Sequence, residues 1–173
     1  MLTRETQSLI EAAGSGDLGA IRGLLEAPNP DLRRHGLYLI RKLQLDEAMP
    51  DAVEHCNDET ASVRTAAALA LADRRDAAYA DVLLKLVNDE SQDVRQVAMR
   101  GLAKLSHPAS PSIAKREYLS AENATGRTLA LAALGLYGGR QAEEILRELL
   151  REEQSPWRRR SIRRAIRRRK PGA

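Results

Sequence analysis

Residues 88–105 read NDESQDVRQVAMRGLAKL, and this stretch indicates how most of the chain folds. Its apolar or small residues recur at intervals of three and four, and they are Val94, Val97, Ala98, Gly101, Leu102 and Leu105. Side chains at this spacing lie on one face of an α-helix. Ser91 precedes them, and its hydroxyl is expected to cap the helix by accepting a hydrogen bond from a first-turn amide.

The same pattern recurs with a period close to 31 residues. Residues 57–74 read NDETASVRTAAALALADR and repeat the Asn-Asp-Glu and Val-Arg of the first stretch. Shorter copies place an arginine at the same position five times, at Arg33, Arg64, Arg95, Arg127 and Arg158. The residue three places later is small in each copy: Gly36, Ala67, Ala98, Ala130 and Ser161. A repeat of this length predicts stacked helical units, and the small residue lets a neighbouring helix approach closely.

The motif D-x-V-R-x-x-A-x-x-x-L at this period resembles HEAT repeats, specifically the short bacterial kind named after phycobilisome lyases. The resemblance covers approximately residues 17–166 and implies an all-α fold, a right-handed α-solenoid of about five HEAT-like helix pairs. Gly126 and Trp157 depart from the valine that two other copies carry before the arginine. Most such repeats bind other proteins, so the resemblance implies a non-catalytic scaffold or adaptor. A minority attach bilin chromophores or bind DNA.

Between the arginine-bearing helices, further apolar-periodic stretches predict the other helix of each pair, at residues 48–56, 78–87, 111–119 and 140–151. We expect these helices to line the concave face of the solenoid, which such folds offer to a partner. The polar residues outside their apolar stripe are the predicted contacts with a protein partner: Asp81, Lys85, Asn88, Lys115, Arg116, Arg147 and Arg151.

The charge of +4 is distributed unevenly along the chain. Residues 154–173 hold nine of the 28 basic residues and no acidic one, so the rest carries 19 basic against 24 acidic residues. We therefore divide the chain into a repeat domain, residues 1–154, and an Arg-rich capping helix and tail, residues 155–173. Four residues are predicted to dock the capping helix on the previous repeat: Trp157, Ile162, Ala165 and Ile166.

The basic segment is the predicted anion-binding site. Its candidate residues are Arg158, Arg159, Arg160, Arg163, Arg164, Arg167, Arg168, Arg169 and Lys170. Like charges three or four places apart disfavour a helix, and an anionic partner would relieve their repulsion. An acidic protein, a nucleic acid and an anionic membrane surface all remain open, as does a solvated cap. Nucleic-acid binding through this helix is the main alternative function, although Trp157 is the segment's only aromatic residue.

The five repeated arginines are predicted to be structural. Because each stands at the same place in its repeat, we expect each to hydrogen-bond a loop between repeats or a carboxylate such as Asp58 or Asp89. Such a ladder would matter for stability only if it is partly buried.

The sequence offers little for catalysis, metal binding or membrane insertion. No nucleophile, phosphate-loop or zinc motif is present, and His35, His55 and His107 are scattered, so we predict no catalytic residue, metal or cofactor. A bilin-lyase-like enzyme or chaperone is a second alternative, against which the 3% aromatic content argues. The single Cys56, the lack of a signal peptide and the lack of a membrane-spanning stretch predict a cytoplasmic protein.

Overall fold

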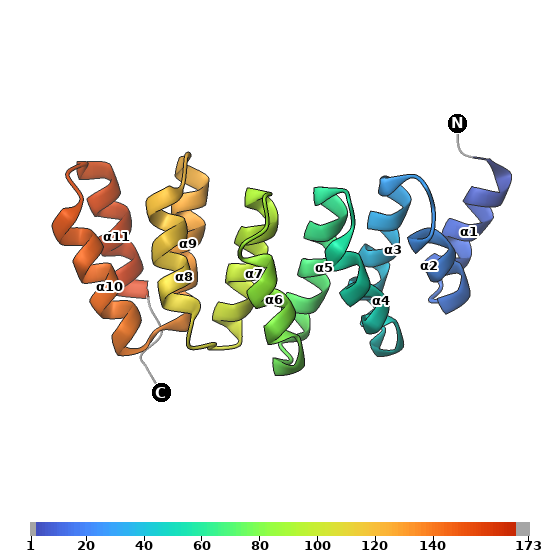
Figure 1. The fold of residues 1–173 in the computed structure, drawn as a ribbon, viewed down its shortest axis with the longest axis horizontal. Helices are drawn as coiled ribbons and strands as arrows, with labels where there is room; N and C mark the ends of the chain where they lie inside the picture. The colour runs from blue at the N-terminus through green and yellow to red at the C-terminus, as the bar shows by residue number, and fades with distance from the viewer. Residues whose placement is uncertain (1–2, 169–173) are drawn as a thin grey trace.

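The computed structural model describes residues 3–168, which form one row of paired helices (Figure 1). The α-helices are α1 (Arg4–Gly14), α2 (Leu18–Leu25), α3 (Pro30–Leu43), α4 (Met49–Glu54), α5 (Ala61–Arg74), α6 (Ala80–Leu86), α7 (Gln92–Lys104), α8 (Ser110–Ser120), α9 (Ala124–Tyr137), α10 (Gly139–Glu152) and α11 (Pro156–Arg168). Short 3-10 helices flank α4, at η1 (Asp46–Ala48) and η2 (His55–Asn57), and η3 (Ala77–Tyr79) precedes α6. The described residues contain no β-strand, which confirms the predicted all-α fold.

The helices stack in two rows. The arginine-bearing helices α3, α5, α7, α9 and α11 each contact the next one along the chain, and each also packs on the helix before it, from α2 to α10. Helix α1 packs on α2 at the N-terminal end of the row. The predicted stack of five helix pairs is therefore confirmed. None of the helices within residues 3–168 is both long and apolar enough to span a bilayer.

Small residues set the spacing between neighbouring repeats. Ala67 and Ala98 are fully buried, in α5 and α7 respectively. A methyl group placed on Gly101 would lie 2.9 Å from the Cβ of Ala72 and 2.9 Å from Cδ1 of Leu83. Helix α7 can therefore pack this closely on α5 and α6 only because position 101 has no side chain.

Some helix starts are capped by a side chain and others are not. Asp17 caps α2, since its Oδ1 accepts from the Ala20 amide at 2.7 Å. Ser91 occupies the cap position of α7, but its hydroxyl makes no capping hydrogen bond. Asp89 accepts from the Ser91 amide at 2.8 Å, one residue before α7 begins, and the prediction of a serine cap was wrong.

The structure shifts the register of the last repeat by one residue. In α3, α5 and α7 the Nη1 atom of the repeat arginine donates to the carbonyl oxygens five and six residues earlier, as Arg64 does to Asp58 and Glu59. In α11 it is Arg159, not Arg158, that donates to the carbonyl six residues earlier, at 2.9 Å. The predicted fifth position, Arg158, was therefore wrong. The residue three places later is Ile162, which is fully buried, so the small-residue rule fails in this copy.

This register also explains the exposure of Trp157. The predicted docking of Trp157 on the previous repeat is wrong, because 77% of the residue is exposed. Trp157 lies two places before Arg159, where α5 carries the exposed Ser62 and α7 the exposed Asp93. The predicted docking of the capping helix is confirmed for Ile162, and Ala165 and Ile166 pack half-buried against the core. Arg169 and Lys170 lie outside the described residues.

Candidate functional site

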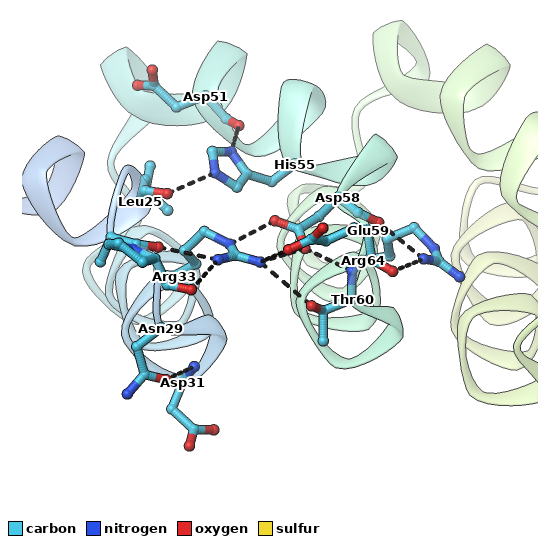
Figure 2. A network of polar contacts seen from close by, with 12 residues as sticks. Leu25, Asn29, Asp31, Arg33, Asp51, His55, Asp58, Glu59, Thr60 and Arg64 are labelled. Carbon is cyan, nitrogen blue, oxygen red and sulfur yellow. Dashed lines mark hydrogen bonds and ion pairs between the residues drawn. The ribbon is translucent and has the colours of Figure 1, made fainter.

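The Arg33 and Arg64 side chains join consecutive repeats through paired hydrogen bonds, and Figure 2 shows the pair between Arg33 and Asp58. Arg33 Nε and Nη2 donate to Asp58 Oδ2 and Oδ1 at 2.8 and 2.9 Å. Arg64 makes the same pair with Asp89, at 2.8 and 2.9 Å. The predicted ladder to Asp58 and Asp89 is confirmed, and it is largely buried, because the four side chains expose between 8% and 10% of their surface.

Each carboxylate in the ladder also accepts a hydrogen bond from a backbone amide. Asp58 Oδ1 also accepts from the Thr60 amide at 2.8 Å, at the start of α5. Burial alone would raise the pKa of Asp58, but the hydrogen bonds from Arg33 and Thr60 outweigh burial and lower that pKa. The pKa of Asp89 is likewise lowered against the effect of burial, by the hydrogen bonds from Arg64 and Ser91. Both carboxylates therefore stay ionised, and each holds the guanidinium of Arg33 or Arg64 inside the protein.

The ladder weakens toward the C-terminal half. Ala121 stands six places before Arg127, where Asp58 and Asp89 stand in the second and third repeats. Arg95 therefore lacks an aspartate, and its Nε instead reaches Glu117 of α8 at 3.5 Å. Arg127 donates from Nη1 to the Ala121 carbonyl. The missing aspartate was visible in the sequence, but its replacement by Glu117 was not.

The spacing of the two helix rows shows that the prediction of which row lines the concave face was wrong. The arginine-bearing helices contact one another all along the row, whereas in the opposite row, among the helices described, close contact between neighbours is confined to α8 and α10. In a curved stack of helix pairs the inner row has the shorter arc, so the arginine-bearing helices lie on the concave side. The predicted concave helices at residues 48–56, 78–87, 111–119 and 140–151 lie on the outer side. The small residues on the arginine-bearing helices are the physical reason.

The seven predicted partner contacts lie on or just after α6, α8 and α10, in this outer row. Asp81, Lys85, Asn88 and Arg151 are exposed. The other three are already paired within the protein: Lys115 Nζ meets Glu148 at 2.6 Å, Arg116 donates to Asn88 Oδ1 at 3.0 Å, and Arg147 meets Glu143 at 2.6 Å. Binding of a partner by these residues stays a prediction.

The concave side carries a groove that sequence reasoning missed. It has a volume of about 460 Å³ and is lined by residues of α3, α5 and α7: Asp31, Arg34, His35, Tyr38, Arg41, Ser62, Thr65, Ala66, Leu69 and Asp93. Most of these stand one, two or five places after a repeat arginine, or two places before it. A search for polar and aromatic residues at these positions would have singled out several of the lining residues, but the groove itself depends on how the helices pack.

Tyr38 is the main aromatic group of this groove. It is 42% exposed, and its ring stacks on His35 with the ring centroids 6.0 Å apart. Lys42 Nζ lies 5.6 Å from the ring centroid on the same helix. Asp31 and Arg34 pair at 3.0 Å and bring both signs of charge into the groove. An exposed aromatic ring among mixed charges and small residues suits the side chains of a peptide.

A second hollow lies on α11. Its volume is about 970 Å³, and the described residues that line it all belong to α11: Pro156, Trp157, Arg160, Arg163, Arg164, Arg167 and Arg168. Two of the predicted anion-binding residues are not part of it. Arg158 lies 3.7 Å from Glu153, and Arg159 donates to the Leu150 and Glu153 carbonyls.

Reactive groups are few in the described residues. Those residues contain no cluster of histidine, cysteine, aspartate or glutamate able to hold a metal ion. Cys56 is 3% exposed, and burial raises the pKa of its thiol to about 12. The His55 ring nitrogens lie 2.8 Å from the Asp51 carbonyl and 3.2 Å from the Leu25 carbonyl, so this side chain connects α4 to the end of α2 (Figure 2).

The family profile of HEAT repeats matches residues 19–103 and 80–167. The chain belongs to the HEAT-repeat family. The profile describes HEAT repeats in general, so the likeness to phycobilisome-lyase repeats stays a prediction. None of the curated proteins matches the chain in sequence.

Solved structures of repeat proteins share the solenoid fold of this chain at low identity. A designed armadillo repeat protein in complex with the peptide (KR)4 is 16% identical with a TM-score of 0.66, over 94% of this chain and 85% of that one. A computationally designed armadillo repeat protein for modular peptide recognition is 18% identical with a TM-score of 0.61, over 97% and 87%. An engineered protein is 17% identical with a TM-score of 0.61, over 94% and 83%. These likenesses support the repeat solenoid alone.

Proposed function

We propose that this HEAT-repeat protein is a non-catalytic interaction module that holds an extended segment of a protein partner in the concave groove across α3, α5 and α7. The observation that carries the proposal is the exposed Tyr38 in a groove built from three consecutive repeats. The basic helix α11 would add electrostatic attraction for an anionic partner. Because two structural relatives were made for, or bound to, peptides, the fold is suited to such a ligand.

The residues that line the groove suit binding better than catalysis. Among the described residues, the titratable groups that line it are Asp31, Arg34, His35, Tyr38, Arg41 and Asp93. Asp31 is paired to Arg34, and Arg41 lies 3.8 Å from Asp73. An aromatic anchor surrounded by residues that exclude water is the usual arrangement at the centre of a binding surface. We therefore assign no catalytic residue.

Selection from a phage library of random peptides tests the proposal. Peptides enriched on the wild-type protein should bind Tyr38→Ala and Ala66→Arg more weakly, because the first removes the aromatic anchor and the second fills the groove. A loss of about tenfold for Tyr38→Ala corresponds to the removal of one buried aromatic contact. Enriched peptides that bind both variants as well as the wild type would overturn the proposal, as would a selection that enriches no sequence.

Lys85→Glu and Asp81→Lys are the matched controls for these variants. Both residues are exposed on α6, in the outer row of helices, and both belong to the contacts predicted from the sequence. If the enriched peptides lose affinity for these variants and not for the Tyr38 and Ala66 variants, the partner-binding surface is the outer one.

Nucleic-acid binding through α11 is the second candidate function. The specific observation in its favour is the run of exposed arginines that line the α11 hollow. Phosphate contacts of this kind would make binding strongly salt-dependent and largely independent of sequence. The experiment that closes the next subsection separates this candidate from an acidic protein partner.

A further inference from the structure

Five arginines of α11 have no acidic partner among the residues that the structure describes. Arg160, Arg163, Arg164, Arg167 and Arg168 are exposed, and within residues 3–168 none of them forms an ion pair. The first turn of α11 contains no acidic residue. Like charges four places apart, and cations near the positive end of a helix dipole, both disfavour this helix. A bound anion would remove this cost.

The register of α11 divides these arginines into two groups. Arg163 stands four places after Arg159, where the preceding repeats bury Leu37, Ala68, Met99 and Leu131. Arg163 and Arg167, four places further, therefore keep the end of the stack polar. Arg160 and Arg164 stand one and five places after Arg159, as Arg34 and Tyr38 do after Arg33.

The second group consequently belongs to the same face as the Tyr38 groove. Trp157 stands two places before Arg159, as Asp31 stands before Arg33 in the groove. Helix α9 lies between the Tyr38 groove and α11. Its exposed residues Thr128 and Ala132 occupy the positions equivalent to Arg34 and Tyr38 and carry no charge. A ligand on the concave side would thus meet mixed charge at α3 and only positive charge at α11.

The spacing of the α11 arginines fits a protein segment. Arg160, Arg164 and Arg168 follow one another every four residues, which advances about 6 Å along a helix. Alternate residues of an extended chain are separated by about 6.6 Å. Acidic side chains at alternate positions of an extended segment would therefore meet successive guanidinium groups, which pair well with carboxylates.

The surroundings of α11 favour a protein over a nucleic acid. Outside residues 154–173 the chain carries 19 basic and 24 acidic residues, so a bulky polyanion would be repelled once it extended beyond α11. Binding of single strands normally combines basic residues with several aromatic rings on which bases stack. The α11 hollow has one such ring, Trp157, which is enough to contact one apolar side chain.

We propose that the concave face of α11 binds an acidic segment of a protein partner, with alternate carboxylates on Arg160, Arg164 and Arg168 and an apolar residue against Trp157. The proposal rests on the proposed function in taking a protein segment as the ligand. It adds the chemistry of that segment and its direction, since the acidic part of the ligand lies at α11 and not at the α3 end.

The test uses the full chain and a synthetic peptide of alternating glutamate and serine with leucine at one end. Trp157 is the only tryptophan of the chain and is 77% exposed, so its fluorescence should shift to shorter wavelength when the peptide covers it. Exchange of Arg160, Arg164 and Arg168 for glutamine should weaken binding about tenfold, since each exposed ion pair contributes a few-fold. The peptide with glutamine in place of glutamate should not bind.

The matched control exchanges Arg140, Arg147 and Arg151 of α10 for glutamine. This variant has the same net charge as the α11 variant, and its three sites are also exposed on one helix, but in the outer row. Equal loss of affinity in both variants would show attraction to net charge alone and overturn the proposal. No binding of the glutamate peptide at low salt would also overturn it.

An oligonucleotide arm distinguishes the two anionic partners. If a single-stranded thymidine oligonucleotide of equal charge binds α11 more tightly than the peptide at the same salt concentration, the ligand is a nucleic acid and the proposal falls. If the glutamate peptide does not bind α11 but the selected peptides still bind the Tyr38 groove, only the proposal of an acidic segment is overturned. If the selected peptides do not bind the Tyr38 groove, the proposed function itself is overturned.

Discussion

Arg64 and Asp89 lie 25 residues apart in the chain, yet their side chains meet through two parallel hydrogen bonds of 2.8 and 2.9 Å. The same guanidinium donates through Nη1 to the Asp58 and Glu59 carbonyls at 2.9 and 3.1 Å. One side chain thus joins the loop that precedes its own helix α5 to the corresponding loop of the next helix pair, between α6 and α7. This arrangement holds consecutive HEAT repeats at a fixed angle.

We expect Asp89→Asn to lower the free energy of unfolding by about 3 kcal/mol, because a largely buried arginine then loses its charged partner. Glu90→Gln is the control, since Glu90 also pairs with Arg64 but its side chain is 85% exposed. The control should change stability by less than about 0.5 kcal/mol. Urea unfolding followed by circular dichroism measures both. Equal effects would mean that the ladder contributes no more than a surface ion pair.

The ladder should also make stability depend on pH in the acid range. The pKa of Asp58 and that of Asp89 are lowered below the ordinary value of 3.8, so below that pH the unfolded chain binds protons that the folded protein does not. Unfolding free energy therefore falls as the pH falls from about 4 toward the lowered values.

The double variant Asp58→Asn/Asp89→Asn checks this dependence by urea unfolding at a series of pH values. Its stability should vary less steeply with pH below 4 than that of the wild type. Asp73→Asn, which removes a carboxylate that is 44% exposed and leaves the ladder intact, is the control. A double variant with an unchanged slope would contradict the assignment of the acid sensitivity to the ladder.

Two helical glycines should respond in opposite directions to alanine. Gly101→Ala places a methyl group against Ala72 and Leu83, and we expect a loss of about 1–2 kcal/mol from overpacking. Gly135→Ala meets nothing within 4 Å in α9 and should gain about 0.5–1 kcal/mol from helix propensity. Thermal unfolding of the two variants measures both signs. A stabilised Gly101→Ala would show that α5 and α7 can separate at little cost.

The register of the last repeat can be tested with neighbouring arginines. Arg159→Ala should cost about 1–2 kcal/mol, because the half-buried Leu150 and Glu153 carbonyls lose their donor. Arg158→Ala removes a half-exposed side chain that lies 3.7 Å from Glu153 and should cost less than about 0.5 kcal/mol. Both variants lose one positive charge, so each controls for the other. The reverse order of effects would restore the register expected from the sequence.

Much of the fold could be predicted because hydrophobic periodicity is a local property. The spacing from Val94 to Leu105 predicts α7, and its recurrence at residues 57–74 predicts α5 and the stacking of the two helices. The Arg33 and Arg64 partners were also within reach, since a repeated arginine and a repeated aspartate at constant separation point to one recurring contact.

The candidate site could not be predicted in the same way. Nothing in the sequence marks Tyr38 as exposed, because its exposure depends on α5 and α7 leaving a groove beside it. Trp157 reads as a docking residue in the sequence when Arg158 is taken as the repeat arginine, but the Arg127 to Arg159 interval is one residue longer than the interval between the second and third copies. That difference turns the indole from the core to the concave surface.

The sequence by itself determined the helical repeats, the arginine at one position in each of the first four repeats and the concentration of positive charge near the C-terminus. These features depend on residues close together in the chain. Only the tertiary structure decided which row of helices is the inner one, which arginines of α11 are already engaged and that Trp157 and Arg160 share a face with Tyr38. Those features depend on how closely helices about 30 residues apart can approach, and Gly101 and its small neighbours set that distance through packing.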